Sequence, residues 1–347
     1  MNIRTLIGLW KANIPVIVWA KIPLLAGLII LGLNGETPEW APLALFLVIV
    51  ALVAAIAESA NTYVDREEDR IYFPSNPLVT GELAVATAGK ALIVQNIITG
   101  LLLIALAVVT RNYQLLVVII AGWLVALMYS LPPFRFKETV AAPFLPALGM
   151  ALLTIATWLL VEPSLTVRNG FVIAFALFLF IFIFGFAVTI KFRKTFHALN
   201  SDLIMIESGN SIYDLDITGL GLKVKTAMAL EAITTLGAFI LVPILWHLEV
   251  FDRTLSIGLL ALPLPLTSIG VVLRMKEPVE NSQLCTMFIT MACGSILLML
   301  FAVALTTLIH WGFAILACLF FLLGFLLLLL TIQPVRRESL FAPWREL

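Results

Sequence analysis

The chain has 347 residues, of which 62% are hydrophobic and 12% charged, and its formal net charge is zero. Soluble domains carry about twice this share of charged residues, so the composition excludes an ordinary soluble protein. Without an excess of positive charge there is no indication of a nucleic-acid partner. Apolar runs of about 20 residues recur along the chain, which predicts an all-α, polytopic membrane protein.

The predicted membrane spans occupy most of the chain and leave no soluble domain or linker, so we expect one transmembrane domain over residues 1–347. The last two apolar runs are interrupted only around His310-Trp311-Gly312, so nine and ten spans are both open. We expect these helices to form a bundle around a central cavity. The approximate ranges are 14–33, 41–63, 84–109, 113–131, 141–162, 170–190, 224–247, 255–273, 284–308 and 312–332.

The positions of the 21 Lys and Arg residues predict the orientation of these spans. Nearly all of them fall on the side of the N-terminus. Arg111, Arg168 and Arg253 fall on the opposite side, and Lys21 lies within the first span. Because positive charge is retained in the cytoplasm, we expect a cytoplasmic N-terminus. Three longer and polar loops, at 64–83, 132–140 and 191–223, then open on the cytoplasmic face together.

The first of these loops begins with a face of oxygen ligands. Asn61, Asp65 and Asp69 are spaced four residues apart, so on one helix they lie within a sector of about 80°. Such a face suits a hard divalent cation, and intramembrane acids are costly unless they bind something. The alternative is a solvated helix end in which Asp65 pairs with Arg66 and Arg70.

Two further motifs follow in the first and second cytoplasmic loops. After Asp69 comes a turn with the sequence Asn76-Pro-Leu-Val-Thr-Gly-Glu-Leu83, and the fourth span ends in Tyr129-Ser-Leu-Pro-Pro-Phe-Arg135-Phe-Lys137. Together with the Asn-x3-Asp-x3-Asp pattern, these segments resemble the UbiA-type intramembrane prenyltransferase superfamily. The resemblance extends over most of the chain, through about the ninth span.

The resemblance implies an enzyme that binds an isoprenyl diphosphate through Mg²⁺. Loss of the diphosphate gives an allylic carbocation, which a lipophilic acceptor attacks within the bilayer. The implied catalytic residues are Asp65, Asp69, Arg135 and Lys137, and the implied substrate-binding residues are Asn61, Arg66, Arg70, Tyr129 and Lys191. Each of the basic residues has an alternative role as an anchor on the cytoplasmic side.

The third cytoplasmic loop departs from the family pattern, which is close to Asp-x2-Asp-x-Glu-Gly-Asp. If Asp202 matches the first acid, Met205 stands at the second and Glu207 keeps its place. We expect Asn61, Asp65, Asp69, Asp202 and Glu207 to hold the metal. Asp214 and Asp216 are the alternative source of carboxylates in this loop.

The sequence thus predicts a magnesium-dependent prenyltransferase that is integral to the membrane, with its acidic loops in the cytoplasm. The implied acceptor is an aromatic compound, a quinone precursor or a lipid. Two alternatives remain: a terpene cyclase on the same scaffold that needs no acceptor, and an ion-coupled transporter that uses the intramembrane acids.

Overall fold

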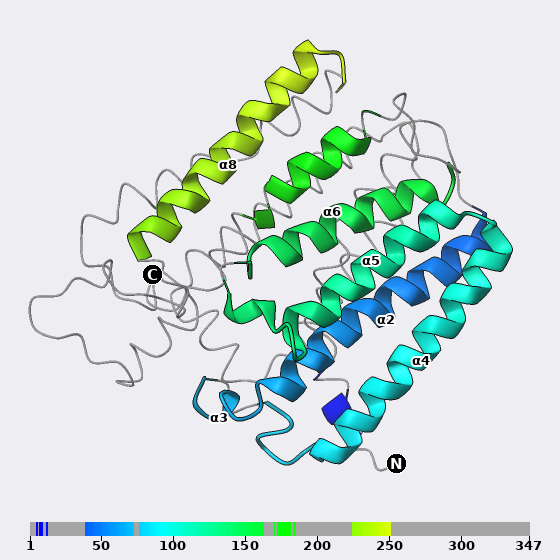
Figure 1. Ribbon diagram of the computed structural model, residues 1–347, viewed down its shortest axis with the longest axis vertical. Coiled ribbons are helices and arrows are strands. Elements are labelled where there is room, and N and C mark those ends of the chain that lie inside the picture. Colours follow the sequence, from blue (N-terminus) through cyan, green and yellow to red (C-terminus); the bar gives the residue numbers. More distant parts are fainter. Residues whose placement is uncertain are drawn as a thin grey trace, which may run out of the picture. The chain divides into compact units, whose positions relative to one another are not determined.

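A computed structural model of the chain describes residues 5, 7–9, 12, 39–72, 76–139, 141–162, 170, 172–181, 183–184 and 224–250. Within these residues every regular element is a helix, as the sequence predicts (Figure 1). The described residues belong to two compact units, and we describe each unit by itself. The predicted spans at 14–33, 255–273, 284–308 and 312–332 lie outside the described residues.

Three helices of the first unit are long and apolar enough to cross a membrane. They are α2 (Trp40–Val64), α4 (Val85–Thr110) and α5 (Tyr113–Ser130). Their bounds agree within one residue with the predicted spans 41–63, 84–109 and 113–131. The sequence pattern therefore predicts this part of the bundle correctly.

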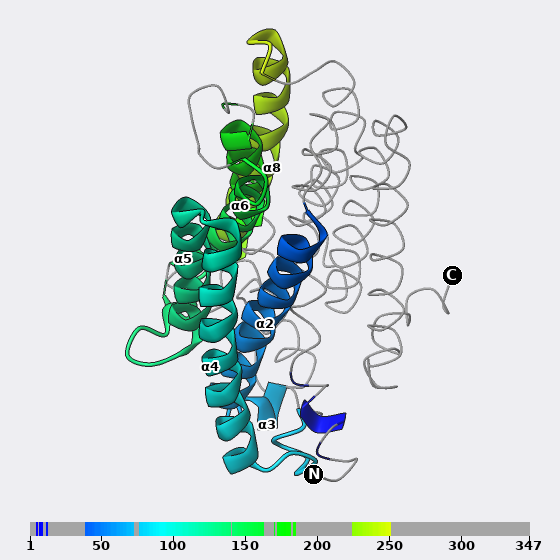
Figure 2. The same ribbon diagram turned by 90° about the vertical axis from the view of Figure 1, so that its right-hand side faces the viewer.

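Helices α2, α4 and α5 pack side by side (Figures 1 and 2). The face of α2 that meets its neighbours is apolar, and Phe46, Ile49, Ile56 and Ala60 are fully buried on it. Ile56 and Ala60 pack against Leu92 of α4. The small side chain of Ala60 allows the helices to approach closely, as is common where membrane helices meet.

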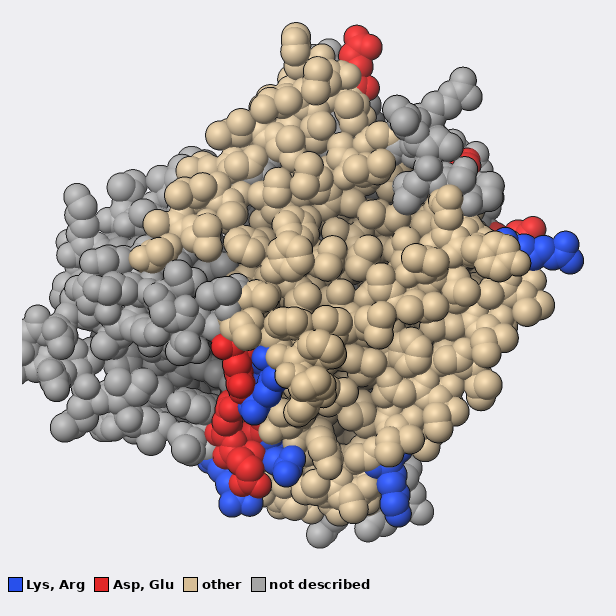
Figure 3. All heavy atoms as spheres, viewed as in Figure 1, with Lys and Arg blue, Asp and Glu red and all other residues tan. Residues whose placement is uncertain are grey.

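The opposite face of α4 is apolar and exposed. Ile93, Ile97, Leu101, Ile104 and Val108 leave more than half of their surface uncovered. In Figure 3, the surface over α4 shows charged side chains only near the ends of the helix. Lipid tails solvate such a surface as well as they solvate one another. We therefore interpret it as facing the bilayer.

The connections place three helix ends together. Only Arg111 and Asn112 separate α4 from α5, so these two helices are antiparallel. At the start of α4, a Cβ on Gly89 would lie 3.4 Å from the Tyr63 ring, near the end of α2. Ser130, the last residue of α5, contacts Asn61 of α2. The end of α2, the start of α4 and the end of α5 thus meet, and we call this the inner end of the unit.

The remaining helices agree with the sequence to different extents. Helix α6 (Phe144–Leu159) is shorter than the predicted span 141–162, because residues 141–143 and 160–161 form turns. A further apolar helix, Val172–Ile181, lies within the predicted span 170–190. Helix α8 (Val224–His247) has the predicted bounds and contains Pro243. Proline is tolerated inside membrane helices.

Candidate functional site

The acidic motif lies where α2 ends. The helix stops at Val64, a turn follows, and the four-residue helix α3 (Asp69–Tyr72) begins at Asp69. The prediction of one uninterrupted helix from Asn61 to Asp69 is therefore wrong. The four-residue spacing survives nevertheless, because the Asp65 N–H donates to the Asn61 carbonyl at 2.9 Å and the Asp69 N–H donates to the Asp65 carbonyl at 2.8 Å.

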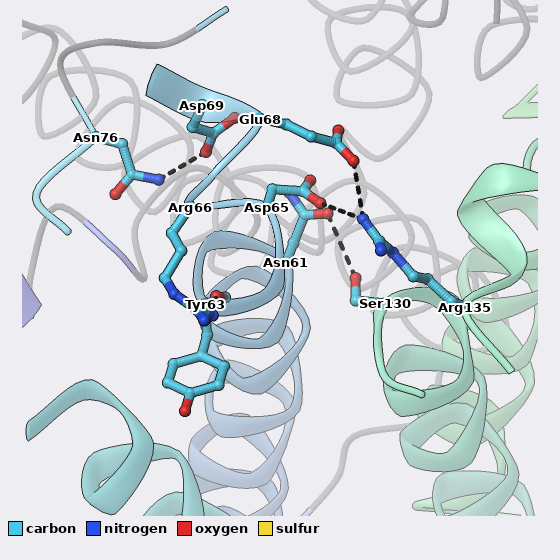
Figure 4. A network of polar contacts seen from close by, with 9 residues as sticks. All are labelled: Asn61, Tyr63, Asp65, Arg66, Glu68, Asp69, Asn76, Ser130 and Arg135. Atoms are coloured by element: carbon cyan, nitrogen blue, oxygen red, sulfur yellow. Dashed lines mark hydrogen bonds and ion pairs between the residues drawn. The ribbon is translucent and has the colours of Figure 1, made fainter. Parts of the chain in front are cut away.

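Asp65 is almost completely buried and faces a cation. The residue is 2% exposed, and its Oδ1 lies 3.5 Å from Nη2 of Arg135. Arg135 follows α5, so this ion pair joins the loop after α2 to the loop after α5 (Figure 4). The backbone of Arg135 has a φ of 41°, in the left-handed region. Such backbones cluster at functional sites because the fold must hold them in place.

Glu68 provides a second carboxylate for the same guanidinium. Its Oε1 accepts a hydrogen bond from Arg135 Nη2 at 2.9 Å. Glu68 was not among the predicted site residues, since it falls outside the four-residue spacing of the acidic motif. The only signal for it in the sequence is its place in the charged run from Asp65 to Arg70.

Asp69 is held by a different partner. The Asn76 side-chain amide donates to Asp69 Oδ2 at 2.6 Å, and both residues are buried. Asn76 Oδ1 also accepts the Leu78 N–H at 2.8 Å. The turn after α3 therefore fixes the Asp69 carboxylate, which points away from Arg135 (Figure 4). In the sequence Asn76 stands only as part of a turn motif, whereas in the structure it also holds the Asp69 carboxylate in place.

The end of α5 closes the cluster from the other side. Ser130 is fully buried, and its hydroxyl donates to Asn61 Oδ1 at 3.4 Å. The neighbouring Tyr129 is half-buried and lies within electrostatic range of Asp65 and Glu58. Predicted site residues Asn61, Asp65, Tyr129 and Arg135 are therefore brought together by α2, α5 and the loop after α5.

Arg66 and Arg70 make other contacts. Arg66 donates to the Tyr63 carbonyl at 2.8 Å, and its guanidinium lies 5.2 Å from the centre of the Tyr63 ring. Arg70 pairs with Glu67 at 3.2 Å, and both side chains are largely exposed. The alternative in which Asp65 pairs with Arg66 and Arg70 is therefore not what the structure shows, because Asp65 pairs with Arg135 instead.

The remaining predicted site residues are not part of the cluster described above. Lys137 is buried in the short helix η1 (Phe136–Glu138) and belongs to the second compact unit. Lys191, Asp202 and Glu207, with the alternatives Asp214 and Asp216, fall outside the described residues.

The ligand atoms that the acidic cluster offers are of the type that a hard cation prefers. Asn61, Asp65 and Asp69 offer oxygen atoms, and two of the three groups are carboxylates, as Mg²⁺ prefers. Among the residues that the structure describes, no three His, Cys, Asp or Glu side chains form a metal-binding group. The described part of the site thus supplies two of the acids and an amide, together with the cation of Arg135, which can bind an anionic substrate.

A family model matches most of the chain. Residues 20–292 match the model described as the UbiA prenyltransferase family. No curated protein sequence matches the chain.

Solved structures of membrane prenyltransferase relatives share the fold. A UbiA homologue from Archaeoglobus fulgidus, bound to DMAPP and Mg²⁺, is 18% identical with a TM-score of 0.59, and the match covers 85% of this chain and 99% of that one. The same homologue bound to GPP and Mg²⁺ gives 17% identity, a TM-score of 0.58 and coverage of 86% and 99%. A structure of digeranylgeranylglyceryl phosphate synthase gives 19% identity, a TM-score of 0.57 and coverage of 86% and 98%.

Proposed function

The chain belongs to the UbiA prenyltransferase family, and on this premise we propose that it transfers an isoprenyl group from a prenyl diphosphate to a lipophilic acceptor within the membrane. The observation that carries the proposal is the cluster at the inner end of the first unit. There, two carboxylates are buried, Asp65 just after α2 and Asp69 at the start of α3, and Asp65 pairs with the Arg135 cation from a loop far along the chain. Buried acids at the end of a membrane helix are costly and indicate a function.

Magnesium is the proposed cofactor, held by Asn61, Asp65 and Asp69 on this side of the site. Asp202 and Glu207 are the proposed ligands from the third loop. The oxygen donor chemistry fits, and two of the structures of similar fold are bound to Mg²⁺ together with a prenyl diphosphate. When bound, Mg²⁺ neutralises negative charge on a leaving diphosphate.

Arg135 is the residue that we assign to the diphosphate. A guanidinium keeps its charge at any physiological pH and donates several hydrogen bonds in a fixed plane, which suits phosphate oxygens. In the structure it is held at the acidic cluster by Asp65 and Glu68. It can therefore stabilise the charge that develops on the leaving group without a large movement of the chain.

The neighbouring polar residues position these groups. Asn76 orients the Asp69 carboxylate, and Ser130 does the same for the Asn61 side chain. Tyr129 lies within electrostatic range of Asp65 and remains a proposed substrate contact, together with Lys137 and Lys191. Arg66 and Arg70, whose described contacts lie with Tyr63 and Glu67, are proposed as weaker, outer contributors to the positive charge around the site.

The same arrangement supports a proposal for how the protein is placed in the membrane. Three described helices are long and apolar enough to span a bilayer, and we propose that the inner end faces the cytoplasm, where the positive charge gathers. The diphosphate then enters from water, and the isoprenoid tail and the acceptor lie among the apolar helices. An aromatic compound, a quinone precursor or a lipid fits this placement as the acceptor.

Turnover assays on the purified protein in detergent test the proposal. Prenyl diphosphates of increasing chain length are supplied with and without acceptors of each class, and the organic extract is examined by mass spectrometry. The expected result is a prenylated product that requires both Mg²⁺ and an acceptor. An altered hydrocarbon in the absence of acceptor would indicate a cyclase, and unchanged prenyl diphosphate under all conditions would contradict the proposal.

A further inference from the structure

One nitrogen atom of Arg135 lies between two carboxylates of unequal burial. Nη2 is 2.9 Å from Oε1 of Glu68 and 3.5 Å from Oδ1 of Asp65. The Asp65 side chain is 3% exposed, whereas the Glu68 side chain is 42% exposed (Figure 4). The shorter contact is therefore made to the carboxylate that lies outside the four-residue series of proposed metal ligands.

A metal ion would change this balance. A divalent cation bound by Asp65 repels a guanidinium beside the same carboxylate, because like charges at a few ångströms in a partly buried site interact strongly. The ion pair between Arg135 and Asp65 is thus the contact that metal binding weakens. Glu68 lies on the turn between α2 and α3 and is not a proposed metal ligand. It can therefore still pair with Arg135 when the metal is bound.

The backbone of Arg135 cannot hold the guanidinium alone. Its N–H donates to the Leu131 carbonyl at 3.0 Å, which fixes the base of the side chain at the end of α5. The tip is separated from this base by a long flexible stem, and ordering such a stem costs conformational entropy. Contacts at the tip keep the charge in place, and the shorter of its two carboxylate contacts is the one with Glu68.

We propose that Glu68 is a positioning residue for the diphosphate site. It retains the Arg135 guanidinium at the mouth of the cluster when the metal takes Asp65, so that the cation meets the diphosphate instead of competing with the metal. This role rests on the proposed function, since it assumes a metal at Asp65 and a diphosphate substrate.

The adjacent Glu67 provides a matched control. It carries the same charge one residue earlier and also pairs with arginines, at 3.2 Å to Arg70 and 3.8 Å to Arg66. Its side chain is 63% exposed, and its ion pairs are with Arg70 and Arg66 and not with Arg135. Exposed ion pairs contribute little, so Glu67→Gln reports the effect of removing one negative charge near the site without removing the Arg135 contact.

The first experiment measures metal binding without turnover. Mn²⁺, a hard cation that accepts the same oxygen ligands, is titrated into the purified full-length protein in detergent, and free Mn²⁺ is followed by electron paramagnetic resonance. Glu68→Gln weakens the shorter of the two carboxylate contacts of Arg135 and so shifts its guanidinium towards Asp65, and we expect Mn²⁺ affinity to fall by roughly 5- to 10-fold, within the range of couplings between contacting residues. Glu67→Gln should change it less than about 2-fold.

The same two variants in an Arg135→Ala background separate positioning from direct ligation. If Glu68 acts through Arg135, Glu68→Gln should have no more effect there than Glu67→Gln. If Glu68 were itself a metal ligand, its effect would persist without Arg135, and the positioning role would be wrong. Glu68→Asp, which keeps the charge, should recover most of the lost affinity if the contact with Arg135 is what matters.

Steady-state kinetics complete the test. We expect Glu68→Gln to raise the KM for geranyl diphosphate and the Mg²⁺ concentration for half-maximal rate more than it lowers kcat. If Glu68→Gln and Glu67→Gln give the same Mn²⁺ affinity and the same kinetic constants while the wild type is active, the role of Glu68 is wrong. The proposed function is not affected by that result. A wild type that neither binds Mn²⁺ nor releases diphosphate overturns the proposed function and the role of Glu68 with it.

Discussion

The two ends of α5 satisfy their polar groups in different ways. At its start, the Asn112 side chain accepts the Leu115 N–H at 3.0 Å and donates to the Leu159 carbonyl at 2.7 Å. These partners are backbone groups, and no charge is involved. At its other end, Ser130 and Arg135 meet the side chains of Asn61, Asp65 and Glu68.

The two ends of α5 differ in whether their polar groups serve the stability of the helix or the proposed function. Every helix leaves backbone groups unpaired at its ends, and a neutral cap such as Asn112 satisfies them. Nothing in helix formation requires two buried carboxylates and a guanidinium at the opposite end. The charged end therefore carries the proposed chemistry, and the neutral end holds α5 to the end of α6.

The largest expected effect is in thiol labelling, because the two ends of α5 are predicted to face opposite sides of the membrane. In a protein that lacks Cys285, Cys293 and Cys318, we expect a cysteine at Thr80 to react with an impermeant thiol reagent only in opened cells. A cysteine at Arg111 should react in intact cells, because the positive charge predicts opposite sides for these positions. Mass shifts of the labelled protein give the readout, and equal labelling of both positions in intact cells would contradict the orientation.

Removal of an acid at the inner end should be the next largest effect. We expect Asp65→Ala and Asp69→Ala each to lower turnover by at least ~10²-fold, since each removes an electrostatic catalytic group. Diphosphate release from a prenyl diphosphate is the measurement, with size-exclusion chromatography to show that the protein stays folded. Release close to the wild-type rate from either variant would remove that residue from the site.

Removal of the cation should cost less than removal of the acids. We expect Arg135→Ala to lower kcat/KM for the prenyl diphosphate by roughly 10- to 100-fold, because charge-assisted hydrogen bonds to phosphate are lost. Arg135→Lys should recover part of this loss, since it keeps the charge but not the planar pair of donors. An Arg135→Ala variant with an unchanged KM and kcat would show that the guanidinium is structural.

The neutral end should affect stability alone, with the smallest effect. We expect Asn112→Ala to lower the free energy of unfolding by about 1–2 kcal/mol, the usual cost of losing a helix cap. Denaturant unfolding in detergent gives this value, and turnover per folded molecule should stay within about 2-fold of wild type. If Asn112→Ala reduces turnover as strongly as Arg135→Ala, the division between the two ends fails.

The sequence predicts the described helices well because apolar runs and their polar boundaries are local signals. The bounds of α2, α4, α5 and α8 follow from hydropathy alone. The prediction for α6 is too long, because the residues at both of its ends form turns while keeping an apolar composition. The single domain and the number of spans beyond the described residues stay predictions.

The pairing of side chains at the site could be predicted only in part. The four-residue spacing selects Asn61, Asp65 and Asp69 as proposed ligands, and the family resemblance of the segment after α5 adds Arg135. The contact between Glu68 and Arg135 joins residues 67 positions apart, and it depends on a turn between α2 and α3 and on the left-handed backbone of Arg135. No spacing rule reports such a geometry. The role of Asn76 was hidden for the same reason, because its proline-rich context suggests only a turn.

Metal-dependent binding of a substrate analogue tests the central claim most directly. Isothermal titration calorimetry of geranyl S-thiolodiphosphate, with and without Mg²⁺, compares wild type with Asp65→Asn at the charged end and Asn112→Ala at the neutral end. We predict that wild type and Asn112→Ala bind the analogue tightly only in the presence of Mg²⁺, and that Asp65→Asn loses this metal-dependent gain. Equal gains in Asp65→Asn and in wild type would contradict the assignment of the inner end as the metal and diphosphate site.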